Sequence, residues 1–417
     1  MHSCLRGSVA AIALGAVVSP VAVQEAPHPP AAELRAPSPA AISFENEAKL
    51  KTAFEHLYNL EFTPALKLFE QVAHAEPQSA TVRAFWASAL LYEILARQGT
   101  LQSQLFVTTN EFMRFPRLPP DAALDASYQK VTDDTRRIAL ERVARNAEDV
   151  DGLFALGLSY GNEANYLAGV KADYLRGLRA GEKSYAYHKR LKALRPEIHD
   201  VGVVLGVHDY VIGSLPGHLR FLLFFLGSTG SRQRGLDFLE EAATGATFLR
   251  TYAQVLQVVA AVRESQMERA LNLALDLRAR YPRNPVFLLE SAKYYRQLDR
   301  YPEAAASCQE LLALLQTHPH NPRVIGPEDA YLELGQIEAE RGNLEPALAY
   351  FDRATAVPEA NARLLAQARM ERGKAFDRLG QREAARAEFE KVIALDVDDR
   401  LTRQAKKYRK SAYKHED

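Results

Sequence analysis

Four histidines fall close together in the middle of the sequence, where imidazole rings could in principle bind a metal ion. They are His188, His199, His208 and His218. Structural zinc sites use cysteines or closely spaced histidine pairs, and no two of these histidines are four residues apart with an acid nearby. Asp209 follows His208 directly, and consecutive residues point to different sides of a helix, so no acid–base pair is expected. We predict no metal site.

Other residue types give no catalytic or cofactor-binding pattern. Gly227 and Gly230 lack the Gly-Lys that completes a phosphate-binding loop. Cys308 falls at an interior position of a helical pattern, where a buried thiol is inert. The chain is therefore predicted not to be an enzyme and to need no cofactor. The elements that carry these residues are then expected to build a binding surface.

Composition limits the class of partner. The 417 residues are 47% hydrophobic and 25% charged, which is ordinary for a folded protein and long enough for two domains or one elongated array. Lys and Arg together number 52, as do Asp and Glu, so the net charge is zero. Nucleic-acid binding proteins usually carry an excess of positive charge, and we expect no nucleic-acid partner.

The first residues have the pattern of an export signal followed by a tether. Ser8 to Val18 is an apolar run as long as the core of a signal peptide, and it is shorter than the roughly 20 residues that span a bilayer. Residues 1–23 are predicted to be the signal peptide and the proline-rich residues 24–41 an extended linker. The protein would be exported, periplasmic or secreted, and soluble after cleavage. A disordered leader rich in alanine and valine is the alternative.

From residue 43 onward, apolar residues recur at helical spacing, and no stretch alternates as a strand does. Two stretches near the C-terminus repeat glycine, alanine and an aromatic residue at the same spacing: Gly335, Ala347 and Phe351, then Gly373, Ala385 and Phe389. A small residue lets two antiparallel helices approach closely, and the ring fills the space between neighbouring helix pairs. Such pairs stack because one pair alone cannot bury its apolar face.

These stretches resemble the tetratricopeptide repeat, whose period of 34 residues also separates Ala270 from Ala304. The resemblance implies an all-α fold, an α-solenoid of antiparallel helix pairs wound into a right-handed superhelix. We expect regular repeats over residues 247–399 and a divergent, irregular helical region over residues 42–246. Residues 400–417 are expected to form a capping helix and tail.

Two insertions interrupt the N-terminal half. Residues 98–123 contain three prolines, and 39 residues separate Gly157 from Pro196 where the repeat requires 24. The second insertion, at 161–183, is therefore expected to add about one turn and one helix. Insertions often lie on one face of a solenoid, so both are candidates for a special surface. The tyrosines gathered in this half favour either a partner groove or ordinary half-buried packing.

A shorter segment, residues 206–242, resembles a signature of the eukaryotic inclusion-body-clearance family of tetratricopeptide-repeat proteins. It carries Ser-Leu-Pro at 214–216, glycines at 227 and 230, and G-L-x-x-L at 235–239. That family is associated with lipid-droplet and mitochondrial outer-membrane biology, so the resemblance implies an apolar ligand. Within the segment, LRFLLFFL at 219–226 is either a buried helix or a surface for lipid or a membrane, with Phe221, Phe224 and Phe225 as the candidate apolar surface.

The resemblance also implies a concave groove lined by the first helix of each repeat. Carried onto the matching units, its residues are Lys293, Arg296, Gln297, Gln336, Glu340, Lys374, Asp377 and Arg378. Chaperone-binding relatives clamp a peptide carboxylate with lysines, but Leu289, Leu332 and Met370 stand at those positions. We therefore predict a non-catalytic scaffold for an extended or folded protein partner, with a lipid-handling or membrane-associated role as the alternative.

Overall fold

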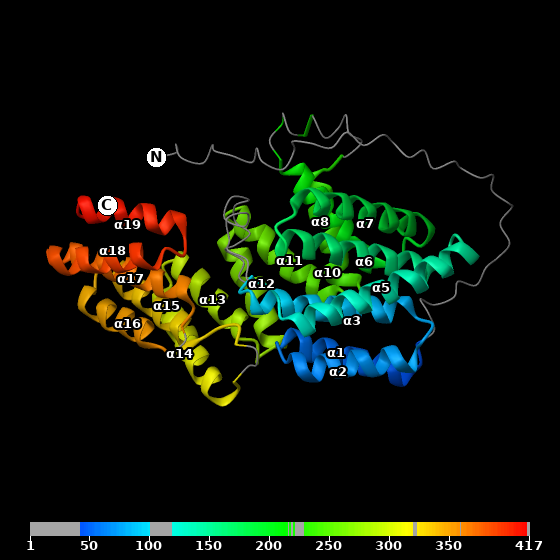
Figure 1. Cartoon of the computed structure of the whole chain (residues 1–417), viewed down its shortest axis with the longest axis horizontal. Helices are drawn as coiled ribbons and strands as arrows, with labels where there is room; N and C mark the ends of the chain where they lie inside the picture. The colour runs from blue at the N-terminus through cyan, green and yellow to red at the C-terminus, as the bar shows by residue number, and fades with distance from the viewer. Residues whose placement is uncertain are drawn as a thin grey trace. The chain divides into compact units, whose positions relative to one another are not determined.

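The computed structural model describes residues 42–100, 119–215, 217, 220–221, 229–319, 323–358 and 360–414. Over these residues the chain forms seventeen α-helices and one 3-10 helix and contains no strand (Figure 1). This confirms the predicted all-α fold. The predicted signal peptide, the linker and most of the insertion at 98–123 lie outside the described residues.

The described residues divide into two compact units between Gln257 and Val258. Unit 1 holds the helices up to the first part of α11, with these bounds: α1 Phe44–Tyr58, α2 Phe62–Ala75, α3 Ala80–Arg97, α5 Ala122–Arg145, α6 Val150–Gly169, α7 Tyr174–Leu194, the 3-10 helix η2 His199–Val201, α8 Gly202–Gly213, α10 Arg232–Gly245 and α11 Arg250–Arg263. The predicted boundary at residue 247 separates irregular from regular repeats and stays a prediction.

Unit 2 continues with eight helices after α11: α12 Met267–Arg280, α13 Pro285–Gln297, α14 Tyr301–Thr317, α15 Pro327–Glu340, α16 Leu344–Ala356, α17 Ala362–Arg378, α18 Arg382–Leu395 and α19 Asp399–Lys410. Each helix from α13 to α18 packs against the next one in the chain, so the unit is a row of antiparallel hairpins (Figure 1). The first helices α13, α15 and α17 also contact one another in order. They form one side of the row, which we call the inner face.

The turn inside most hairpins is built in one way. Five residues there have a left-handed backbone, and each ends the first helix of a pair: Leu60, Ser265, Asp299, Gly342 and Gly380. In each turn, the next residue donates its N–H to a carbonyl five residues back, as Gln266 does to Ala261 at 2.9 Å. This is the Schellman motif, which satisfies the last carbonyls of a helix. Only two of the five positions hold glycine, the residue that adopts this backbone without strain.

Ser265 therefore offers a site for stabilisation. Its φ of 57° is a conformation that costs a residue with a Cβ roughly 1–2 kcal/mol, so we expect Ser265→Gly to raise the free energy of unfolding by about 1 kcal/mol. Thermal unfolding followed by circular dichroism measures the change. Gly342→Ala is the matched reverse: φ is 84° and a Cβ there meets nothing within 4 Å, so only backbone strain is added. A Gly342→Ala variant as stable as the parent would contradict this account.

The predicted small and aromatic residues meet where the repeat pattern places them. A Cβ added to Gly335 would lie 2.4 Å from the ring of Phe351, and one added to Gly373 would lie 2.5 Å from the ring of Phe389. Both rings are fully buried, as are Ala347 and Ala385 beside them. The glycines let paired helices approach closely, and the rings form the centres of successive apolar clusters.

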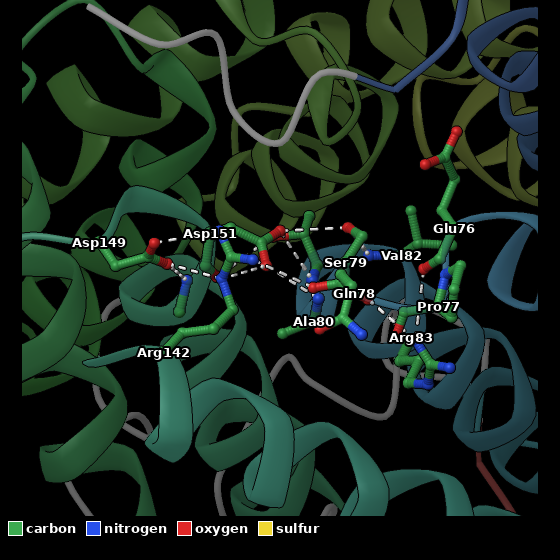
Figure 2. A network of polar contacts seen from close by, with 12 residues as sticks. Glu76, Pro77, Gln78, Ser79, Ala80, Val82, Arg83, Arg142, Asp149 and Asp151 are labelled. Carbon is green, nitrogen blue, oxygen red and sulfur yellow. Dashed lines mark hydrogen bonds and ion pairs between the residues drawn. The ribbon is translucent and has the colours of Figure 1, made fainter. Parts of the chain in front are cut away.

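Buried carboxylates link helices that are far apart in sequence. Asp151, at the start of α6, is 2% exposed and accepts hydrogen bonds from Ala80 N at 2.8 Å and from Thr81 N and Ser79 Oγ at 3.1 Å (Figure 2). It thereby caps α3, and Nε of Arg142 on α5 lies 3.2 Å from Oδ2, the oxygen that also accepts from Ala80 N. Asp200 does the same for α11, accepting from the backbone N–H groups of Thr247, Phe248 and Leu249 at 2.8 Å each. Unpaired N–H groups at a helix start favour a negative charge, so these carboxylates fix how the helices meet.

Candidate functional site

The hairpin of α6 and α7, with helices of 20 and 21 residues, accounts for the insertion at 161–183. Gly157 and His188 meet as Gly335 and Phe351 do, because a Cβ on Gly157 would lie 2.3 Å from the imidazole ring. The two pairs are 31 and 16 residues apart. The 15 added residues lengthen each helix by roughly two turns. The expectation of an added turn and helix was wrong, because equal lengthening keeps the two antiparallel helices paired.

A polar hollow of about 540 Å³ lies beside this lengthened part, between α5, α6 and the turn that leads into α7. Tyr128, Thr132 and Arg136 follow one another at four-residue spacing along the α5 wall, and Glu163, Tyr166 and Lys171 belong to the opposite side. We call this feature the hairpin hollow. Its wall is held by the stacked rings of Tyr128 and Tyr166, whose centroids are 5.0 Å apart.

Ion pairs and hydrogen bonds fix the other side chains that line the hollow. Arg136 Nη2 lies 2.6 Å from Glu163, and its Nε donates to Ser159 Oγ at 2.9 Å. Tyr166 donates its hydroxyl to Asp125 at 2.6 Å, while Lys171 Nζ lies 4.0 Å from the same carboxylate. The walls are therefore fixed by contacts that do not need a ligand.

One serine motif escaped the sequence reasoning. Residues 157–161 read G-L-S-Y-G, the spacing of a nucleophile elbow. Such an elbow needs a sharp turn between a strand and a helix, but Ser159 lies in the middle of α6 and is 1% exposed. Its hydroxyl oxygen already accepts from Arg136. The geometry gives this serine a structural role.

The structure places the predicted groove residues on the three helices of the inner face. Arg296 of α13 joins this helix to α15, with Nε 2.6 Å and Nη1 2.5 Å from the carboxylates of Glu333 and Glu340. Burial alone would lower the pKa of Arg296, but the two carboxylates outweigh it and raise that pKa. Lys293 is buried beside Glu290, with Nζ 3.4 Å from Oε1. Arg296 thus links the first helices of two successive repeats, whereas the Lys293 pair stays within α13.

On α17 the predicted groove residues also contact the chain itself. Lys374 pairs with Glu371 at 2.7 Å, and Arg378 donates to the carbonyl of Ala339 at 2.7 Å. Asp377 accepts from Arg382 at 2.9 Å and from the backbone N–H of Tyr413 at 2.7 Å. Gln297 on α13 is exposed and Gln336 on α15 is half-buried. Neither amide takes part in the ion pairs described above.

The candidate apolar surface lies mostly beyond what the structure describes. Phe221 is 66% exposed. Phe224 and Phe225 lie outside the described residues. Among the helices that the structure does describe, none is long and apolar enough to cross a membrane.

Comparison with known families decides the identity of the array. Residues 179–320 match the family model described as Iml2/Tetratricopeptide repeat protein 39, and residues 366–399 match that of a single tetratricopeptide repeat. The chain contains tetratricopeptide repeats. The first match encloses the 206–242 segment and confirms its resemblance to the inclusion-body-clearance family. No curated protein matches the chain significantly.

Several solved structures are similar to this chain. Yeast Tom70 is 11% identical over 88% of this chain and 89% of its own, with a TM-score of 0.42. The Cut9 and Hcn1 hetero-tetramer of the APC/C gives 11% identity over 88% of this chain and 57% of the other, with a TM-score of 0.47. The human IFIT1 dimer with m7Gppp-AAAA is 13% identical over 89% of this chain and 89% of its own, with a TM-score of 0.43.

Sequence reasoning missed the residues of the hairpin hollow. Tyr128, Thr132 and Arg136 belong to α5, and the sequence analysis had no repeat motif to assign to that helix. The available signal was the four-residue spacing of a tyrosine, a threonine and an arginine along a helix in which about half of the other positions are also polar, so it did not stand out. That spacing places them on one face, directed at whatever packs there.

The buried imidazole of His188 predicts an acid-sensitive unit 1. Burial lowers the pKa of His188 from its ordinary 6.5 to about 4, so the folded chain keeps the ring neutral. As the pH falls below 6.5 the unfolded chain binds a proton that the folded chain does not, and stability is lost until the pH reaches the folded value. We expect unit 1 to lose about 2 kcal/mol between pH 7 and pH 5 through this ring.

The fluorescence of Trp86, the sole tryptophan of the chain, reports urea unfolding of unit 1 at each pH. His188→Gln cannot take up the proton, so its stability should vary less over the same range, whatever its stability at pH 7. An unchanged pH profile in this variant would assign the acid sensitivity to other groups.

Proposed function

We propose that this protein is an exported, non-catalytic scaffold that holds a protein partner on the inner face of unit 2. The observation that carries the proposal is the contact of α13, α15 and α17 in order, which puts one side of three successive repeats on a single continuous surface. Repeats of this type commonly use that surface for binding. The ion pairs of Arg296 and its neighbours make the surface rigid, so little order has to be gained on binding.

Three glutamines allow a matched test of the surface. Gln297 of α13 and Gln336 of α15 lie on the inner face, while Gln309 is exposed on α14, the second helix of a pair. A photo-crosslinking amino acid would replace each in turn, in cells of the source organism. We expect the same protein to be trapped from positions 297 and 336 and not from position 309. Equal trapping at position 309, or none at the inner positions, would refute the inner face as the binding surface.

Export is the second part of the proposal, and the apolar run at residues 8–18 with the proline-rich stretch behind it supports it. Intact-mass measurement of the protein from the source organism should show the loss of about the first 23 residues. Fractionation should place it outside the cytoplasm. If the protein were found at full length in the cytoplasm, the export proposal would be refuted, and the proposed scaffold role would be unaffected.

A further inference from the structure

Helix α7 carries an excess of positive charge in a chain whose net charge is zero. Its 21 residues contain one acid, Glu182, and six lysines and arginines. Glu182 faces α8, where its Oε1 lies 3.3 Å from Nε2 of His208. Five residues of α7 recur at three- and four-residue spacing and therefore lie along one side of the helix, and we call them the α7 stripe: Arg176, Arg179, Lys183, Tyr187 and Arg190. All four of its cations are exposed.

The charge of the α7 stripe is largely unpaired. Arg176 has an acid nearby, since its Nη1 lies 3.7 Å from a carboxylate oxygen of Asp173. Within the described part of the chain, neither Arg179 nor Lys183 has a carboxylate at ion-pair distance. Like charges three or four residues apart on a helix repel each other and lower its stability. The row of cations from Arg176 to Lys183 is therefore not explained by a contribution to the fold.

Two cations of the stripe are held in place by neutral groups, which leave their charge uncompensated. Lys183 Nζ lies 5.0 Å from the centroid of the Tyr160 ring on α6, and Tyr187 stacks on the same ring at a centroid distance of 5.8 Å and an angle of 4°. Arg190 donates from Nη2 to the carbonyl oxygen of Ala147 at 2.7 Å. A partner would meet charges that are already positioned, so it would lose less side-chain entropy on binding.

The aromatic ring beside the stripe separates two classes of anionic partner. Proteins that bind single-stranded nucleic acids combine cations with exposed ring faces on which bases stack. Here the half-buried ring of Tyr160 already packs against Tyr187, and the cations of Arg136 and Lys183 lie 4.6 Å and 5.0 Å from its centroid. This ring holds cations and is not open to a base. Carboxylates need no ring, so an acidic protein segment fits these contacts better.

We propose that the α7 stripe binds an extended acidic segment of a partner protein. From Arg176 to Arg190 the stripe is about 21 Å long, because each residue of a helix adds about 1.5 Å. An extended segment of about seven residues covers that length. Arg179 and Lys183 are about 6 Å apart along the helix axis, close to the roughly 6.6 Å between alternate side chains of an extended chain. Alternate acidic side chains of the segment can therefore each reach one cation.

The C-terminal helix α19 has the same excess of charge and serves as the matched comparison. Its 12 residues contain six lysines and arginines and one acid, Asp399. Because α19 is the last helix of the row, its charge has another explanation: a terminal repeat needs a polar outer face to stay soluble. That explanation does not apply to α7, which packs against α6 before it and α8 after it.

Fluorescence polarisation with the whole protein at low ionic strength tests the partner class. The labelled probes are a peptide of alternating glutamate and serine, the same peptide with glutamine in place of glutamate, and an oligothymidylate of equal charge. We expect saturable binding of the glutamate peptide and weaker binding of the other two. No binding of the glutamate peptide, or equal or tighter binding of either other probe, would overturn the proposal. The inner face of unit 2 plays no part in this surface, so either proposal can fail alone.

Variants locate the binding surface. Arg179→Gln combined with Lys183→Gln removes two unpaired cations and should weaken binding of the glutamate peptide about tenfold, since each exposed ion pair contributes a factor of at most about five. Arg179→Lys combined with Lys183→Arg keeps the charge and should bind as the parent does. Lys406→Gln combined with Lys407→Gln removes the same charge from α19 and should leave binding unchanged. Equal loss of affinity in the α7 and α19 variants would mean diffuse attraction between charges and would overturn the proposal.

The unliganded protein gives a readout that needs no probe. Arg179→Gln removes a repulsion and no ion pair, so the urea midpoint of unit 1, followed by Trp86 fluorescence, should stay the same or rise. Arg142→Gln removes a cation that is paired with Asp149 and should lower the midpoint. A lower midpoint for Arg179→Gln would mean that this cation already stabilises the fold, and the basis of the proposal would be lost.

Discussion

Asp151→Ala is expected to lower the free energy of unfolding of unit 1 by about 4 kcal/mol. The carboxylate is almost completely buried and accepts from two backbone N–H groups and one hydroxyl at the start of α3. Alanine would leave those donors without partners. It would also remove one of the two acids beside Arg142, whose Nε lies 2.8 Å from Asp149 and 3.2 Å from Asp151 (Figure 2). Breaking a buried ion pair on one side costs more than the pair itself contributes.

Urea unfolding followed by Trp86 fluorescence measures this loss directly, because Trp86 lies on α3, the helix that Asp151 caps. Asp133→Ala on α5 is the matched control: the residue is exposed, so the change should stay within about 0.5 kcal/mol. If Asp151→Ala behaved like Asp133→Ala, the start of α3 would be held by other contacts and the cap described above would be unimportant.

Gly157→Ala should be the second most damaging change, with an expected loss of about 3 kcal/mol from unit 1. The added Cβ would lie 2.3 Å from Cε1 and Nδ1 of His188. The imidazole ring has no space to move, because it is fully buried and its centroid lies 5.7 Å from that of the Phe154 ring. Its Nδ1 is also hydrogen-bonded to the carbonyl oxygen of Ser184 at 2.9 Å. Overlap of this kind pushes the two long helices apart along their whole contact.

Gly181→Ala in the same hairpin separates this overlap from the general effect of alanine in a helix. A Cβ at position 181 meets only the methyl of Ala164 at 4.0 Å, so the variant should be as stable as the parent or up to about 1 kcal/mol more stable. In a Gly157→Ala, His188→Ala double variant the overlap is gone, and the double variant should lose less than the sum of the two single changes. Strict additivity would show that the two residues do not interact.

The regular repeats could be predicted because their signal is local. Gly335 with Phe351 and Gly373 with Phe389 lie within one hairpin each, and the closeness of two helices requires a small residue opposite a ring. The resemblance of the 206–242 segment, which the family model over residues 179–320 confirms, could be found for a similar reason. In both cases a few residues at fixed spacing describe a contact made within about one repeat length.

The rest depended on contacts that spacing does not encode. Asp151 caps a helix that begins 71 residues earlier, and the sequence around Asp151 contains no pattern that predicts this contact. His188 occupies the place of an aromatic ring, but the lengthened hairpin moved it away from the expected position. The predicted groove residues were placed on neighbouring helices, yet their ion pairs with one another are visible only in three dimensions. The export signal and the choice of binding surface stay predictions.

The lengthened hairpin of α6 and α7 restricts which changes of chain length such a repeat can tolerate. Both helices grew by about the same number of turns, and the meeting of Gly157 with His188 survived. Removing about seven residues from each helix should therefore give a shorter repeat that still stacks on its neighbours. Removing them from one helix alone would slide one partner along the other and separate the glycine from the ring. Changes of length in such repeats should consequently occur in both helices of a hairpin together. The added ends of the two helices can then vary, while the part of the hairpin that contains the glycine–ring contact stays constant.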